Sequence, residues 1–273
     1  MTTLAPPATG GRPLADMLTM LRRNLLRAAR YPALTSFTVA IPVLLLLLFV
    51  VVFGGAVGAG VAPGVAPGAE GRAAYLDYIT PAIMLFAVVG AAQSVAITAA
   101  MDATGGIMAR FRTMAIAPSS VLGGPVLGTV VQGIGAVGVV LAVAVALGYR
   151  PQAGPADWLA LVGLVALVTF ATAWLCVAMG LAAPSVETAS NTPMMLTALP
   201  FLSSGFVPVA TMPGPVRWFA EHQPFTPVIE TTRALLVGDP VPPGTVLAAV
   251  GWSVAIAAVG LVWSRAQYRR ERH

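Results

Sequence analysis

The segment GIMARFRTMAIAPSSVLGG, from Gly106 to Gly124, combines an apolar stripe with cationic side chains. The stripe falls at the spacing of one helical face, and two arginines flank it: Ile107, Met108, Phe111, Met114 and Ala115, beside Arg110 and Arg112. Such a helix can insert its apolar face into a groove of a partner while the arginines pair at the rim. It can equally be an amphipathic linker at lipid headgroups. In both cases the segment would bind another molecule, either a partner protein or lipid headgroups.

A second segment, FLSSGFVPVATMPGPVRWFAEHQPFTPVIETTRALLVG, runs from Phe201 to Gly238. Its prolines suit the starts of two short helices, and its aromatic residues are typical of membrane interfaces: Pro213, Pro215, Pro224 and Pro227, with Trp218, Phe219 and Phe225. Helical spacing lets Arg217 pair with Glu221, and Glu230 with Arg233. We expect two outer helices within residues 209–238, which either re-enter the membrane or cap the helices from outside.

Groups that could perform covalent or metal chemistry do not gather in this sequence. Cys176 stands alone in an apolar run, and His222 and His273 lack the spacing of metal ligands. Apart from Arg217, near the end of the fifth window, no charged residue lies inside the spans predicted below, which disfavours a proton-coupled antiporter, an ion pump and an intramembrane hydrolase. Three acids at span boundaries could still dip inward: Asp77, Asp102 and Glu187. We therefore predict a chain without catalytic residues and without a metal site.

The fifteen basic residues are all arginine. A phosphate-binding loop of the Walker type needs a lysine that reaches the phosphates, and this sequence has no lysine. If ATP drives the protein, another polypeptide must therefore bind the ATP and its Mg²⁺. The arginines lie at the edges of apolar segments and not in one solvated patch, so nucleic-acid binding is not expected.

Composition indicates which elements position these segments. The chain is 58% hydrophobic and 9% charged, whereas a soluble domain is roughly 25% charged. So much apolar surface suits a bilayer, whose core needs about 20 apolar residues per helix. Six windows are long enough: 33–57, 78–101, 113–149, 158–186, 188–220 and 240–264. The fifth is the least regular, because Pro193, Pro200 and Pro208 divide it.

The distribution of arginine predicts the orientation. If both termini are cytoplasmic, eleven of the fifteen arginines lie inside, as the positive-inside rule favours. The fold class is then an all-α membrane protein with six transmembrane helices in a bacterial cytoplasmic membrane. We expect a cytoplasmic tail and interfacial helix in 1–31, a six-span domain in 32–265 with a cytoplasmic loop at 102–119, and a basic cytoplasmic tail in 266–273.

Residues 13–30 predict an amphipathic helix. Leucine and methionine side chains follow one helical face, and three arginines fall opposite them: Leu14, Met17, Leu18, Leu21 and Leu25, against Arg23, Arg27 and Arg30. Because a span follows directly, we expect this helix to lie flat at the membrane, with its leucines in the acyl boundary and its arginines near anionic headgroups. The alternative is an ordinary amphipathic helix packed on protein.

Polar and aromatic side chains within the spans are candidates for a substrate path: Phe86, Gln93, Gln132, Trp174, Phe201 and Phe206. Polar groups at this depth often only join helices, at about 0.6 kcal/mol each. The aromatic rings could contact a hydrophobic substrate or lipid. The sequence leaves these alternatives open.

Both segments described first resemble those of ABC-2 type permeases, and most closely the permeases of daunorubicin-resistance exporters. The loop is similar to the pattern G-I-M-x-R-F-R-x-M-x-I followed by V-L-G-G, through Gly106, Ile107, Met108, Arg110, Phe111, Arg112, Met114, Ile116, Val121, Leu122, Gly123 and Gly124. The outer segment is similar to F-L-S-S-x-F-V-P, then M-P, N-P and E-x-x-R, through Phe201, Leu202, Ser203, Ser204, Phe206, Val207, Pro208, Met212, Pro213, Pro224, Glu230 and Arg233. The family usually has an acid at Ala109, a proline and then an arginine where Ala115 and Pro118 stand, and asparagine at Gln223.

The resemblance implies a type V exporter-like fold and an export mechanism. Two permease subunits, identical or different, would pair, and an ABC ATPase subunit would engage each through the loop around Arg110, as a coupling helix. The outer helices, with Trp218 among their residues, would gate release of amphipathic drugs or lipid-like compounds. Alternatives are a permease for a cell-envelope lipid or polysaccharide, an ion-gradient-driven secondary transporter, and a membrane enzyme or assembly factor.

Overall fold

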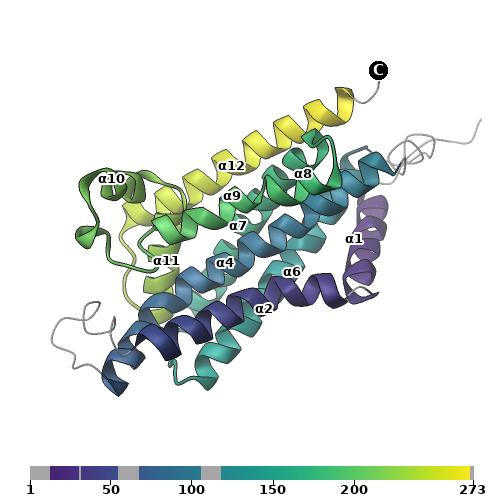
Figure 1. The fold of residues 1–273 in the computed structure, drawn as a ribbon. Coiled ribbons are helices and arrows are strands. Elements are labelled where there is room, and N and C mark those ends of the chain that lie inside the picture. Colours follow the sequence, from purple (N-terminus) through teal and green to yellow (C-terminus); the bar gives the residue numbers. More distant parts are fainter. Residues whose placement is uncertain (1–12, 31, 55–67, 106–117, 271–273) are drawn as a thin grey trace, which may run out of the picture.

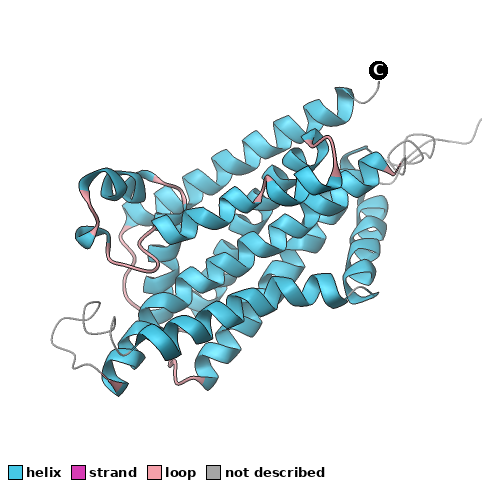
Figure 2. Ribbon diagram, viewed as in Figure 1, coloured by secondary structure: helices cyan, strands magenta, loops and turns pink. Residues whose placement is uncertain are grey.

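The computed structural model describes residues 13–30, 32–54, 68–105 and 118–270, and the regular structure in these ranges is helical. Four long helices dominate (Figures 1 and 2): α4 (Ala69–Thr104), α6 (Pro118–Ala146), α7 (Pro155–Ala182) and α12 (Pro243–Arg270). Each is apolar and long enough to cross a membrane, since about 20 residues span the core of a bilayer. The windows predicted as the second, third, fourth and sixth spans are therefore apolar helices of sufficient length.

The first and fifth windows have a different form. The first is α2 (Pro32–Leu48), which continues into a π-helical turn, η1 (Phe49–Phe53), and has a shorter apolar stretch over Thr38–Phe53. The fifth is broken into α8 (Val186–Asn191), α9 (Met194–Ala198) and a 3₁₀ turn, η2 (Leu199–Leu202). Proline has no N–H and its ring clashes with the preceding turn, so Pro193 and Pro200 interrupt the helix.

Two short helices follow the broken segment, as the proline spacing predicts. After a 3₁₀ turn, η3 (Val209–Thr211), the chain forms α10 (Gly214–His222) and α11 (Phe225–Val237). They lie at one end of the long helices, and α1 (Pro13–Arg30) and the end of α12 lie at the other (Figure 1). The molecule therefore has two distinct ends, with the apolar helices between them.

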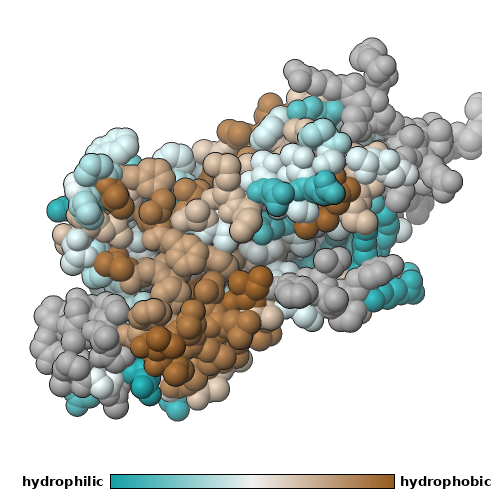
Figure 3. All heavy atoms as spheres, in the orientation of Figure 1, coloured by the Kyte–Doolittle hydropathy of each residue, from teal (hydrophilic) through white to brown (hydrophobic). Residues whose placement is uncertain are grey.

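Exposed apolar side chains cover the middle of the molecule. In Figure 3 the most hydrophobic residues gather over α2, and hydrophilic residues lie mainly toward the two ends. On α2 and η1 the exposed side chains include Ile41, Leu44, Leu48, Val51 and Val52. An exposed apolar band of this kind suits acyl chains better than water.

Close helix packing surrounds α7. A Cβ built at Gly180 would overlap the carbonyl oxygen of Ala96 on α4, and one built at Gly260 of α12 would lie 2.5 Å from the backbone nitrogen of Leu175. Small residues at such positions let helix backbones approach closely in membranes. The glycines thus hold α4, α7 and α12 together as one unit.

This packing makes Gly180 sensitive to a single methyl group. We expect Gly180→Ala to destabilise the protein by about 1–3 kcal/mol through overpacking, measured as a lower melting temperature in detergent. Gly163→Ala is the matched control on the same helix, because a Cβ there meets no atom within 4 Å. An unchanged melting temperature for Gly180→Ala would show that α4 and α7 do not pack this tightly.

Candidate functional site

The two helices that flank residues 106–117 both contact α1. The loop residues predicted to contact a partner lie outside the described residues: Gly106, Ile107, Met108, Arg110, Phe111, Arg112 and Met114. The flanks are described, since α4 ends at Thr104 and α6 begins at Pro118. The contacts made by the end of α4 and the start of α6 therefore flank these residues in the chain.

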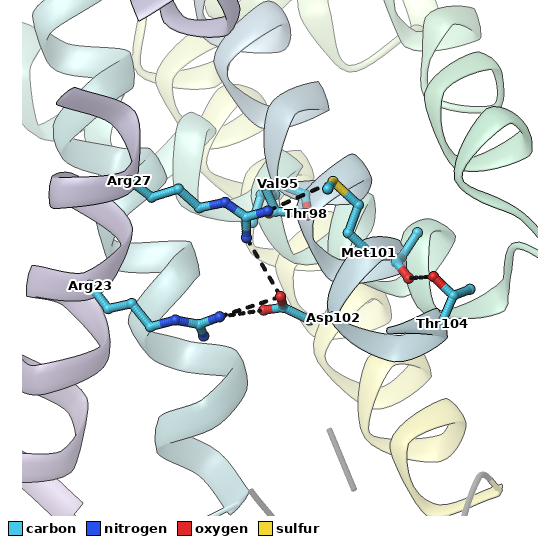
Figure 4. A network of polar contacts seen from close by, with 8 residues as sticks. Arg23, Arg27, Val95, Thr98, Met101, Asp102 and Thr104 are labelled. Atoms are coloured by element: carbon cyan, nitrogen blue, oxygen red, sulfur yellow. Dashed lines mark hydrogen bonds and ion pairs between the residues drawn. The ribbon is translucent and has the colours of Figure 1, made fainter. Parts of the chain in front are cut away.

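Two arginines of α1 bind the acid near the end of α4 (Figure 4). Arg23 Nη2 lies 3.4 Å from both carboxylate oxygens of Asp102, and Arg27 Nη1 lies 3.5 Å from Asp102 Oδ1. Arg27 Nη2 also lies 3.7 Å from the sulfur of Met101. Asp102 is only 8% exposed, and a buried carboxylate needs such cationic partners. We name these three charged residues, Arg23, Arg27 and Asp102, the clasp.

The other contact of α1 is with the start of α6. A Cβ built at Gly124 or Gly128 would overlap Met20 or Asn24, so only glycine allows this approach. Gln132 Nε2 then donates to Asn24 Oδ1 at 2.8 Å. Because α1 also binds Asp102 of α4, it bridges the two helices that flank residues 106–117.

These contacts add a protein partner that the prediction for α1 did not include, while its position at the membrane interface stays a prediction. Arg23 and Arg27 were expected near headgroups, but both pair with Asp102, because that carboxylate is a counter-charge within reach. The helix is packed on protein along this face, which is the alternative that the amphipathic pattern left open. On other faces Leu18 is 64% exposed and Leu26 is 43% exposed, so apolar side chains remain free to contact acyl chains.

At the opposite end, Arg233 of α11 binds a tight turn after η2. Its Nη2 donates to the carbonyl oxygens of Ser204 at 3.0 Å and Tyr78 at 3.2 Å, and its guanidinium lies 4.1 Å from the centre of the Tyr78 ring. Tyr78 Oη donates to the same Ser204 carbonyl at 2.7 Å. Tyr78 is on α4, so these contacts join α4, the turn and α11.

The two ion pairs predicted for the outer helices have different outcomes. Arg217 Nε donates to Glu221 Oε1 at 2.8 Å, as predicted. The prediction that Glu230 pairs with Arg233 is wrong. Arg233 binds the carbonyls of Ser204 and Tyr78, while Glu230 stays exposed. A carbonyl oxygen has two lone pairs and can accept a hydrogen bond from a guanidinium N–H.

Burial governs the titration of side chains at this end. Burial lowers the pKa of Arg233, an effect that Tyr78 and then Glu230 oppose. Burial also raises the pKa of Tyr149, between α6 and α7, to about 12; Asp77 adds to this rise and Arg233 opposes it. The Tyr149 hydroxyl is therefore neutral at physiological pH.

Other residues of the outer segment fix its turns. Pro208 precedes η3, Met212 ends it and Pro213 starts α10, while Pro224 starts α11. Gln223, where the resemblance led us to expect asparagine, donates from Nε2 to the Leu199 carbonyl at 3.2 Å. Trp218 is exposed and stacks on His222, with ring centres 4.8 Å apart.

The six candidate substrate-path residues lie in separate places. Phe201 stacks on Phe206 with ring centres 4.6 Å apart and meets Phe86 edge-on at 5.4 Å, so these three form one aromatic group. Gln93 donates to the Pro193 carbonyl at 3.1 Å and contacts Thr197 of α9, and Gln132 contacts α1. Trp174 of α7 meets Phe170 edge-on.

The pockets near these residues are small. One is lined by residues of α7, α11 and α12 and the other by residues of α4, α7 and α11, and each has about 10 Å³. That volume holds about one water molecule, far less than the roughly 300 Å³ of a drug-sized site.

Comparison with known proteins gives the class. The family described as "ABC-2 type transporter" matches residues 15–237, which include α1, the long helices α4, α6 and α7, and the outer helices. The chain belongs to the ABC-2 type transporter family, and it is an integral membrane protein.

The relatives carry more specific names. A daunorubicin resistance ABC transporter permease of Streptomyces coeruleorubidus is 30% identical over 174 residues, which cover 62% of this chain and 60% of the relative. A probable doxorubicin resistance ABC transporter permease of Mycobacterium tuberculosis is 25% identical over 192 residues, covering 70% and 69%. The chain thus matches about three fifths of the length of the first of these relatives.

Proposed function

We propose that the chain is the permease subunit of an ATP-driven exporter, powered by a separate ATPase. The observation that carries this proposal is the bridge that α1 makes between the two flanks of the cytoplasmic loop, through Asp102 on α4 and Gly128 on α6. A force applied to the loop would move α4, α6 and α1 together. Family membership and the names of the relatives support the same function.

The partner ATPase would supply the ATP-binding site that this sequence lacks. ATP and Mg²⁺ would bind to the partner, since the chain has no lysine for a phosphate-binding loop. The loop around Arg110 and Phe111 would insert its apolar face into a groove of the partner. Closure of the ATPase on ATP would then push the loop against the ends of α4 and α6.

The bilayer arrangement that we propose has six crossings. The four long helices, α2 with η1, and the broken segment α8–α9–η2 would each cross, with both termini and the loop at the cytoplasmic face of a bacterial inner membrane. Residues 32–265 would form the transmembrane domain, residues 1–31 and 266–273 the cytoplasmic tails. The outer helices α10 and α11 would dip into the outer boundary.

A second permease subunit would cover the broken segment. Non-helical backbone at membrane depth is tolerated only where protein buries it or water reaches it, and Met194 and Met195 are 65% and 76% exposed. We propose that this face meets the partner permease or the path between the two. The aromatic group of Phe86, Phe201 and Phe206 lies beside the same segment and would contact an amphipathic, drug-like substrate.

The first experiment tests the partnership. We expect an ABC ATPase, encoded beside this protein, to co-purify with it from membranes in mild detergent, and its hydrolysis rate to change on assembly. A neighbourhood without such a gene, together with purification free of any ATPase, would remove the basis for ATP-driven export.

A double substitution tests the loop. We expect Arg110→Ala with Phe111→Ala to reduce ATP-driven efflux about tenfold, because a few interface residues carry most of the binding energy, while the amount in the membrane stays unchanged. Arg265→Ala removes an exposed arginine at the end of α12 and serves as the control. Normal efflux by the double variant would exclude this loop as the contact with the ATPase.

A further inference from the structure

Three elements meet at the outer end around the carbonyl of Ser204. Tyr78 comes from α4, Ser204 from the turn after η2, and Arg233 from α11. The Ser204 carbonyl accepts hydrogen bonds from both Tyr78 Oη at 2.7 Å and Arg233 Nη2 at 3.0 Å. One backbone oxygen therefore ties together segments 126 and 29 residues apart in the chain.

The contact is specific to these side chains. The Arg233 guanidinium lies over the Tyr78 ring and also donates to the Tyr78 carbonyl. Both hydrogen bonds come from the one nitrogen Nη2, while the planar guanidinium stacks on the ring, and this stacking is what a lysine ammonium lacks. Arg233 is thus held by a ring and two carbonyls, while Glu230 on the same helix is exposed.

The turn itself is tightly packed. A Cβ built at Gly205 would lie 2.5 Å from Ala82 Cβ on α4 and 3.1 Å from Ile229 Cδ1 on α11. The Gly205 backbone nitrogen donates to Ser203 Oγ at 3.1 Å. The turn is therefore packed between α4 and α11, beside the contacts that Arg233 and Tyr78 make with it.

Yet the contact is not fully satisfied. Within the part of the chain that the structure describes, Arg233 Nε and Ser204 Oγ are buried without hydrogen-bond partners. An unpaired buried polar group costs free energy, which is regained when the group reaches water or a new partner. The contact is therefore easier to open than a fully bonded one, which is what a reversible closure needs.

We propose that Tyr78, the Ser204 carbonyl and Arg233 form a latch that closes the outer end of the substrate path and opens for release. Phe201 and Phe206 flank the latch in sequence; Phe201 is already exposed and Phe206 is buried, so opening the turn would expose the Phe206 ring to the outside. The role in release rests on the proposed export function, whereas the closure of the turn does not.

Labelling of a cysteine in the turn tests the closure in the isolated permease. Cys176 is the single cysteine, so Cys176→Ser gives a cysteine-free background in which Ser204→Cys is the reporter. Ser204 is 4% exposed, and its hydroxyl makes none of the latch bonds. The rate is measured with a membrane-impermeant maleimide on the protein in lipid nanodiscs.

We expect Tyr78→Phe, which removes only the hydroxyl, to speed labelling about tenfold, the effect of losing one good hydrogen bond. Arg233→Lys should have at least the same effect. Arg217→Lys is the control, since that arginine lies on neighbouring α10 and pairs with exposed Glu221. Equal rates in Tyr78→Phe, Arg217→Lys and the unsubstituted latch would overturn the proposal, whether or not Arg233→Lys folds.

A second experiment distinguishes a contact that opens during transport from a contact that stays closed. In the complex with the ATPase, non-hydrolysable ATP should speed labelling of the reporter when the latch is intact, and have little further effect in Tyr78→Phe. Labelling that does not respond to nucleotide in the intact complex would overturn the role in release. Failure of any ATPase to bind would instead count against the export function, and the result in nanodiscs would still decide the closure.

Discussion

Asp102→Arg is expected to reduce ATP-driven export at least tenfold while the protein still inserts in the membrane. The substitution would place a third cation between Arg23 and Arg27, at a position that is 8% exposed. Like charges in such a site repel strongly, and an unpaired buried charge is costly. The repulsion would release α1 from α4, so a push on residues 106–117 by the proposed ATPase would no longer move the two helices together. Dye efflux from vesicles that contain the assembled complex measures this loss.

The clasp allows a rescue that a general folding defect would not. Arg23→Asp combined with Asp102→Arg restores an opposite-charge contact, and we expect efflux to recover by about threefold or more relative to Asp102→Arg alone, which corresponds to about 0.7 kcal/mol. Glu187→Arg is the matched control, since Glu187 is an exposed acid near the start of α8. Full activity of Asp102→Arg would exclude the clasp from coupling.

Gly128→Leu has the second large expected effect. A Cβ at this position overlaps Asn24, so a leucine would push α1 off α6 and break the hydrogen bond between Gln132 and Asn24. We expect a loss of about 1–3 kcal/mol in stability from overpacking, seen as a lower melting temperature in detergent, and a loss of export at least as large as that of Asp102→Arg.

Gly138→Leu is the control for this substitution on the same helix. A Cβ at Gly138 meets no atom within 4 Å, so the added side chain should leave the melting temperature of the purified permease unchanged. If the two leucine variants melt at the same temperature, α1 does not pack on α6 as described, and the bridge between the flanks of the loop is absent.

Several elements could be predicted from the sequence because their causes are local. Long charge-free windows gave α4, α6, α7 and α12, since apolar length alone decides whether a helix can cross a bilayer. Proline positions gave the outer helices α10 and α11. The pair of Arg217 and Glu221 followed from their spacing on one helix.

The partners of α1 and Arg233 could not be predicted, because they come from distant parts of the chain. Asp102 lies 79 residues from Arg23, and Tyr78 lies 155 residues from Arg233. An amphipathic pattern shows that a helix has two faces but not what covers either one, so the arginines of α1 were assigned to lipid. Glu230 was the nearest acid in sequence to Arg233, yet buried carbonyls took its place.

Export of a substrate with force from a separate ATPase is the function that we propose for this membrane chain. Its most direct test is transport of a hydrophobic fluorescent dye by proteoliposomes that contain the chain alone or with the ATPase encoded beside it. We predict ATP-dependent transport only with both proteins, and its loss when the Walker lysine of the ATPase is replaced by alanine. Transport by the chain alone, driven by an imposed proton or sodium gradient, would contradict the account.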